Sequence, residues 1–101
     1  PKSNRINFAL GEEAPLHVTA SGIVTLAFAG EEVAEPFINA GLDRFTKHTV
    51  TNAKRFRALL SSVRKLGYFI NKEMYEEGVC SVAAPVFASG APAIGAISVG
   101  F

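Results

Sequence analysis

The chain of 101 residues lacks tryptophan and carries a single cysteine, Cys80. One cysteine excludes an internal disulfide framework and fits a reducing compartment, so we expect a cytoplasmic protein. No apolar run approaches the roughly 20 residues that span a bilayer, and no basic start followed by an apolar stretch indicates a signal peptide. We therefore expect no membrane partner. The net charge of +1 gives no reason to expect a polyanionic one.

Hydrophobic residues make up 49% and charged residues 19% of the chain, which is typical of a folded globular domain. Its length allows one domain at most. The chain begins at Pro1 and ends at Phe101, directly after a strand-like run. We expect residues 1–101 to be part of a larger protein.

The rest of the chain is organised around residues 67–101. Residues 78–87 and 93–101 are rich in β-branched and small side chains, which predicts two buried strands joined by a tight Gly/Pro turn. A short strand near residue 69 and an acidic loop precede them. Alternation of Ile6, Phe8 and Leu10 predicts a further short strand over residues 5–10.

Three helices are expected between these strands. Residues 53–66 carry an amphipathic stripe between a capping Asn52 and Gly67. Residues 20–29 are apolar enough for a buried helix or strand, and Thr19 or His17 before them with Gly30 after them favours the helix. Residues 31–40 predict a helix that Pro36 interrupts and Gly41 ends, and residues 42–51 predict an extended linker.

Residues that could carry catalysis or bind a metal are few and badly spaced. His17, His48 and Cys80 show no spacing typical of metal ligands, and no serine stands in a nucleophile elbow. The cluster of Glu73, Glu76 and Glu77 is typical of a solvated loop. We expect no enzyme, no metal and no cofactor. The basic face of residues 53–66 could contact phosphate, but the lack of interleaved aromatic residues favours an ordinary solvated face.

Polar or small residues recur in apolar surroundings at Ser21, Gly22, Asn71, Ser81 and Ser98. A few convergent polar groups in an apolar pocket are how small-molecule sites are built. Alternatively, local backbone groups satisfy each of these side chains. Composition alone leaves both interpretations open.

Five stretches resemble, in order and spacing, the effector-binding domain of IclR-type bacterial transcription regulators. Residues 15–22 are similar to the family's Pro-Leu-His-Ala-Thr/Ser-x-x-Gly segment, and residues 42–51 to its Leu-x-x-x-Thr-x-x-Thr-Ile segment. Residues 64–68 match Arg-x-x-Gly-Tyr at the end of its long helix. Residues 78–87 and 96–99 resemble its Gly-Val/Leu-x-Cys/Ser-Ile/Leu-Ala-Ala-Pro-Val/Ile-Phe and Ala-Ile/Leu-Ser-Val/Ile strands.

The resemblance implies a mixed α/β fold of the α+β type: a GAF-like curved antiparallel sheet with helices packed around it. It implies a domain that binds a small-molecule effector, commonly an organic or aromatic acid, and forms a homo-oligomer, a dimer or tetramer. Promoter DNA would be bound only through a separate N-terminal winged helix-turn-helix domain. That domain, the early part of the effector domain and its closing helix are expected to be absent from residues 1–101.

Carried over position by position, the resemblance also implies a set of ligand-contacting residues. Backbone donors to the ligand's carboxylate would come from Ala20, Ser21 and Gly22, and a polar contact from Asn71. The residues that would line the pocket from the sheet are Val79, Ser81, Ser98 and Gly100. An apolar wall would be formed by Ile6 and Phe8. The family commonly has Asp where this chain has Asn71, a neutral group that can donate as well as accept. Ile23 and Cys80 stand where Lys and Arg are frequent in the family, and Gly100 stands where family members can have Ser.

Two other functions remain open. A purely structural oligomerisation module with a vestigial pocket would also explain uncovered strands at the ends and the apolar segment 20–29. A small enzyme on a GAF-like scaffold would need a nucleophile–base or metal spacing that the chain lacks. Ligand binding separates the sensor from the module.

Overall fold

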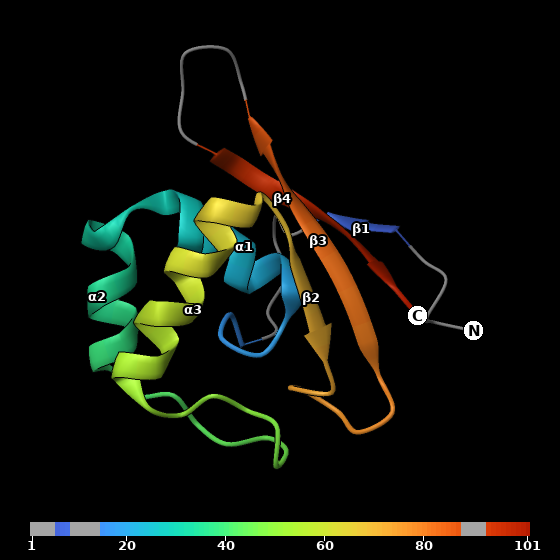
Figure 1. The fold of residues 1–101 in the computed structure, drawn as a ribbon, viewed down its shortest axis with the longest axis horizontal. Helices are drawn as coiled ribbons and strands as arrows, with labels where there is room; N and C mark the ends of the chain where they lie inside the picture. Colours follow the sequence, from blue (N-terminus) through green and yellow to red (C-terminus); the bar gives the residue numbers. More distant parts are fainter. Residues whose placement is uncertain (1–5, 9–14, 88–92) are drawn as a thin grey trace.

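The computed structural model describes residues 6–8, 15–87 and 93–101. The elements follow in the order β1 (Ile6–Phe8), α1 (Ala20–Ala29), α2 (Glu31–Asn39), α3 (Ala53–Leu66), β2 (Phe69–Lys72), β3 (Cys80–Phe87) and β4 (Ala93–Gly100). The four strands form one antiparallel sheet in the order β1-β4-β3-β2 (Figure 1). The expected combination of an antiparallel sheet with packed helices is confirmed.

All three helices lie on one side of the sheet, with α1 next to the strands and α2 and α3 outside it (Figure 1). The largest fully buried side chains come from this inner layer and from α3: Val18, Ile23, Val24, Leu26, Phe56 and Val63. On the opposite face of the sheet, Ile70, Ile97 and Val99 remain between 37% and 42% exposed. The core therefore lies between the sheet and the helices, and α1 is at its centre.

The predicted helix over 53–66 is confirmed with both of its ends. The side chain of Asn52 accepts a hydrogen bond from the Arg55 N–H, and Gly67 adopts the left-handed conformation at φ 81°. Phe56, Leu60 and Val63 of the apolar stripe are buried. Local signals fixed this helix because its caps and its stripe lie within one stretch of sequence.

The prediction that Pro36 interrupts the second helix is wrong. Helix α2 runs through Pro36 to Asn39 and buries Ala34 and Ile38. Proline removes only one intrahelical donor, and Ala40 N–H still donates to the Pro36 carbonyl at 3.1 Å. Packing of the buried face against α1 holds this short helix together.

The segment 42–51, expected to be extended, instead contains a compact turn over residues 45–48. Thr46 and Thr49 are buried, and their hydroxyl groups accept hydrogen bonds from backbone N–H groups within the turn. Serine and threonine hydroxyls stabilise turns in this way. None of the described helices has the length and the hydropathy needed to cross a membrane.

The strands β3 and β4 are confirmed, with a register irregularity between Val86 and Phe87. The expectation that they are buried is wrong for β3, in which only Ala83 is buried, because the helices cover one face of the sheet. The Gly/Pro turn expected between them lies outside the described residues, as does much of the strand expected over residues 5–10. Of that strand the structure describes Ile6–Phe8, paired with β4. A groove of about 310 Å³ lies between α3 and β2, and none of the expected site residues lines it.

Candidate functional site

The first turn of α1 is built on Thr19 and Gly22. Thr19 is extended (φ −112°, ψ 147°), and its hydroxyl oxygen accepts a hydrogen bond from Gly22 N–H at 3.1 Å. A Cβ on Gly22 would lie 2.6 Å from Leu16 Cα, so only glycine lets the preceding turn approach this closely. Of the three backbone donors expected here, Gly22 N–H is therefore already occupied by Thr19.

The N–H groups of Ala20 and Ser21 belong to the unpaired first turn of the helix. The first turn of α1 carries no acidic side chain, so its own residues do not neutralise the positive end of the helix dipole. Ala20 is 1% and Ser21 8% exposed. Backbone donors at a helix start without a neighbouring carboxylate are suited to an anionic group.

The sheet beneath α1 presents small residues. Ser81 lies directly opposite Asn71 on one side and Gly100 on the other, and Ala83 lies opposite position 98. Residues directly opposite each other share a face of the sheet. Ala83 is 2% exposed and α1 packs on β3 and β4, so this face is the one that the helices cover. The register thus brings Asn71, Ser81, Gly100 and position 98 to the same face.

Asn71 is 4% exposed, and both ends of its carboxamide are occupied by backbone groups. Its Nδ2 donates to the Val18 carbonyl at 2.7 Å, and its Oδ1 accepts from Met74 N–H at 3.0 Å. The side chain therefore joins the turn before α1 to the connection between β2 and β3. Sequence reasoning identified Asn71 as a polar contact for a ligand but missed these two backbone partners.

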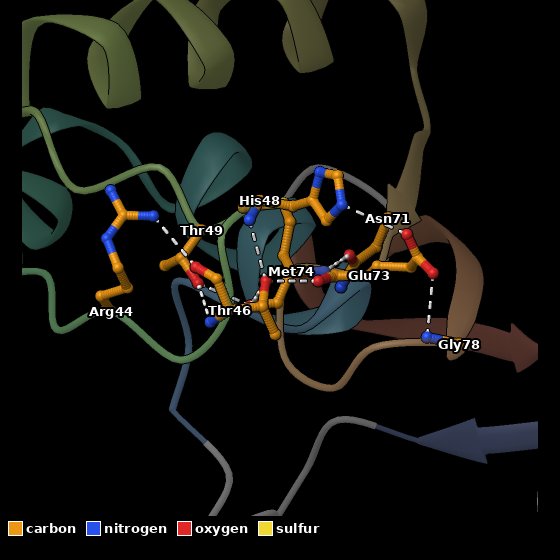
Figure 2. Close-up of polar contacts among 8 residues, drawn as sticks. All are labelled: Arg44, Thr46, His48, Thr49, Asn71, Glu73, Met74 and Gly78. Carbon is orange, nitrogen blue, oxygen red and sulfur yellow. Dashed lines mark hydrogen bonds and ion pairs between the residues drawn. The ribbon is translucent and has the colours of Figure 1, made fainter.

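A group of threonine hydroxyls holds this connection from the other side (Figure 2). Thr49 Oγ1 donates to the Met74 carbonyl at 2.8 Å, and Thr46 Oγ1 donates to the Glu73 carbonyl at 2.6 Å. Glu73 has a positive φ of 60°, and its carboxylate accepts from Gly78 N–H at 2.9 Å. The two threonines three residues apart were the available signal, since a buried hydroxyl needs a partner.

The two histidines occupy different surroundings. His17 is 4% exposed, its Nε2 lies 2.7 Å from the Asp43 carbonyl oxygen, and its ring lies between those of Phe37 and Phe45. His48 is exposed, with Nε2 3.3 Å from Glu73 Oε2 (Figure 2). Within the described residues, no three His, Cys, Asp or Glu side chains gather as a metal site would require. Glu73 is thus tied into the fold, whereas the sequence suggested a purely solvated acidic loop.

The remaining expected site residues are not all brought together. Val79 is 42% exposed beside the β2–β3 connection. The register pairs Ile6 with Val99 and Phe8 with Ile97, whereas Asn7 pairs with position 98. Val99 and Ile97 lie on the face away from the helices, so positions 6 and 8 are in register with that opposite face. The role of Ile6 and Phe8 as an apolar wall stays a prediction, and the site proposed below is argued without them.

Comparisons with known proteins identify the family to which the chain belongs. A family model described as "Bacterial transcriptional regulator IclR C-terminal" matches residues 1–101. The Pca operon regulatory protein of Acinetobacter baylyi is 29% identical over 97% of the chain, and the glycerol operon regulatory protein of Streptomyces griseus 39% identical over 98%. The chain spans 37% and 39% of the length of these two relatives.

Solved structures show the same fold. The inducer-binding domain of a PobR double mutant from Acinetobacter, in complex with 3-hydroxybenzoic acid, aligns with a TM-score of 0.84 at 33% identity, over 91% of this chain and 55% of that one. An IclR homologue from Microbacterium hydrocarbonoxydans, in complex with 4-hydroxybenzoate, aligns with a TM-score of 0.81 at 32% identity, over 86% of this chain and 36% of that one. Because the family model matches the chain over residues 1–101 and the fold is shared with solved members, the chain belongs to the IclR family of bacterial transcriptional regulators and represents part of its C-terminal effector-binding domain.

Proposed function

We propose that residues 1–101 form the effector-sensing part of a non-catalytic transcription regulator, and that the effector is a small organic or aromatic acid. The acid would lie between the first turn of α1 and the sheet face at Ser81, position 98 and Gly100. The observation that supports this most directly is the start of α1. Its Ala20 and Ser21 N–H groups are left over by the helix, and no acidic side chain lies in its first turn.

The sheet supports the same proposal. Ser81, Ala83 and Gly100 have small side chains or none, and such residues let a ligand or another backbone approach a strand closely. The names and complexes of the relatives refer to different compounds, from hydroxybenzoates to a glycerol operon. Our choice of an acid as the effector therefore rests on the start of α1. In the full-length protein, binding would control promoter DNA binding through an N-terminal domain and would act within a dimer or tetramer.

A thermal-shift experiment on the full-length protein tests this proposal. The panel contains 3-hydroxybenzoate, 4-hydroxybenzoate, benzoate and short aliphatic acids, each with its neutral amide. A ligand at a hundredfold excess over its dissociation constant stabilises the folded state by about 2.7 kcal/mol, which raises the melting temperature measurably. We expect acids to act and amides to act weakly. No shift with any member, in a folded protein, refutes the proposal.

Ser98→Leu is the matched variant, and its neighbour Val99→Leu is the control. Position 98 is in register with the buried Ala83 beneath α1, whereas Val99 is 37% exposed on the opposite face. We expect Ser98→Leu to abolish the shift caused by the acid and Val99→Leu to preserve it. An unchanged shift in Ser98→Leu would count against this location of the site.

One observation favours a second function, an oligomerisation module with a vestigial pocket. Ile70, Ile97 and Val99 expose apolar surface on the face of the sheet away from the helices. Exposed apolar patches of this kind mark interaction surfaces. Self-association is expected under both functions, so the same ligand panel decides between them.

A further inference from the structure

Three segments that are distant in the sequence meet behind the first turn of α1. They are the turn formed by residues 15–19, the segment formed by residues 42–51, and the connection between β2 and β3. Asn71 lies where they converge. Figure 2 shows its side chain beside Met74, whose carbonyl accepts a hydrogen bond from Thr49. Its bonds to Val18 and Met74 span 53 and 3 residues of sequence.

Four hydrogen bonds form a circuit that two stretches of the chain, residues 43–49 and 17–18, close. From the Val18 carbonyl it passes through the Asn71 carboxamide to Met74, and from the Met74 carbonyl to the Thr49 hydroxyl. It returns from the same segment through the Asp43 carbonyl to His17, which precedes Val18 in the chain. The three residues whose side chains belong to the circuit are each 4% exposed: His17, Thr49 and Asn71. Met74, which takes part through its backbone, is 5% exposed.

The occupied carboxamide limits what Asn71 can do for a ligand. Its Oδ1 already accepts from Met74 N–H and its Nδ2 already donates to Val18, so one N–H and one lone pair of Oδ1 remain, and only that N–H could bind an anionic ligand. Breaking either bond would leave a buried backbone group without a partner, which is costly. The bond to Val18 instead holds the turn that precedes α1. Because Thr19 follows Val18 and caps α1, the same bond fixes the position of the Ala20 and Ser21 N–H groups.

We propose that Asn71 is a positioning residue of the effector site, that it acts through the turn before α1, and that Thr49 holds it in place. This inference rests on the proposed function for the site that is positioned. In the circuit, the Thr49 hydroxyl binds Met74 and also accepts from the N–H groups of Phe45 and Thr46, at 3.0 and 2.9 Å. Removing that hydroxyl takes the shorter of two threonine hydrogen bonds from the Met74 carbonyl, leaves the one from Thr46 Oγ1 at 3.5 Å, and so loosens the acceptor side of Asn71.

Three variants of the full-length protein separate positioning from direct contact. Thr49→Val removes the hydroxyl at nearly constant shape, and Thr49→Ser is its control because it keeps the hydroxyl. Asn71→Leu removes both hydrogen bonds of the carboxamide without adding charge. Dissociation constants are measured for 4-hydroxybenzoate by calorimetry, for each single variant and for the double variant Thr49→Val/Asn71→Leu.

If Asn71 positions the site through the turn before α1 and Thr49 holds Asn71 in place, the two substitutions break the same circuit. We expect each to weaken binding about tenfold, Thr49→Ser to bind as the wild type does, and the double variant to stay near tenfold. If the double variant binds 4-hydroxybenzoate about a hundredfold more weakly than the wild type, the two substitutions act independently. That result overturns the inference in favour of direct contact between Asn71 and the ligand. Unchanged affinity in Thr49→Val also overturns it.

A second readout does not depend on a ligand and keeps the inference apart from the proposed function. If the wild type binds no member of the acid panel, the proposed function fails, and amide hydrogen exchange in the free protein then decides about positioning. If amide exchange in the first turn of α1 is at least about fivefold faster in Thr49→Val and in Asn71→Leu than in the wild type, and the exchange rates in α3 are unchanged, the result supports positioning. If the variants exchange in α1 at the wild-type rate, or if their exchange rate rises as much in α3 as in α1, the inference is overturned.

Discussion

Gly22→Ala is the substitution that tests most directly how the start of α1 is built. The added Cβ would overlap the Leu16 carbonyl oxygen and would lie 2.6 Å from both Leu16 Cα and Thr19 Oγ1. Unstrained carbon contacts lie at about 3.5–4.0 Å, so something must move by about 1 Å. Two of the three overlaps are with backbone, which cannot rotate away as a side chain can.

The cost follows from what resists this movement. The turn that contains Leu16 is held by the Asn71 bond to Val18 and by the His17 bond to Asp43. Overpacking of this kind costs about 1–3 kcal/mol, and a displaced Thr19 cap costs about 1 kcal/mol more. The better helix propensity of alanine returns about 1 kcal/mol. The net expectation is a loss of about 1–3 kcal/mol in the free energy of unfolding.

Urea unfolding followed by circular dichroism measures this loss. With a slope of about 2 kcal/mol per molar urea, the midpoint should fall by about 0.5–1.5 M. Ser62→Ala, at an exposed position of α3, is the control and should change the unfolding free energy by less than about 0.5 kcal/mol. A Gly22→Ala midpoint equal to or above that of the wild type would refute the close packing of this turn.

Three further expectations concern the helices. Asn52→Ala should lower the unfolding free energy by about 1 kcal/mol because Arg55 N–H loses its acceptor, and Asn52→Asp should restore the urea midpoint. Gly67→Ala should cost about 1 kcal/mol in the same assay because φ is 81° at this position; an unchanged midpoint would contradict the left-handed helix end. The hydrogen bond from Arg57 holds the pKa of Glu35 below its ordinary value of 4.5. The stability from this pair is therefore present above pH 4.5 and lost as the pH falls through the lowered pKa, and Arg57→Gln should return the pKa to its ordinary value in a carboxyl NMR titration.

Elements with local signals could be predicted from the sequence, and elements with distant partners could not. Helix α3 carries its stripe and both caps within 16 residues, from Asn52 to Gly67. Helix α1 is apolar on nearly every side, so periodicity could not separate it from a strand, and only Thr19 and Gly30 favoured the helix. A proline in the sequence predicts an interruption, but it does not reveal that packing of Ala34 and Ile38 keeps α2 continuous through Pro36.

The site divides in the same way. The resemblance indicated Ser21, Asn71 and Ser81, and the register brings Asn71 and Ser81 opposite each other. The segment 42–51 was misinterpreted because the acceptors of its threonine hydroxyls, Glu73 and Met74, lie 25 to 28 residues further along the chain. No local pattern reports such a partner. The wall role of Ile6 and Phe8 depended on a strand register that alternation alone cannot supply.

The span of the Asn71–Val18 bond has a consequence for the order in which the protein folds. Its partners are 53 residues apart, and the His17–Asp43 and Thr49–Met74 contacts bridge 26 and 25 residues. Contacts between distant residues form only after loop closure has been paid in entropy, whereas α3 needs only its own residues. During synthesis on the ribosome, the start of α1 would emerge before Asn71 and the β2–β3 connection. Until these residues had been synthesised, the turn before α1 would lack its hydrogen bond to Asn71. Binding competence would therefore be acquired late, as one of the last steps toward the native state.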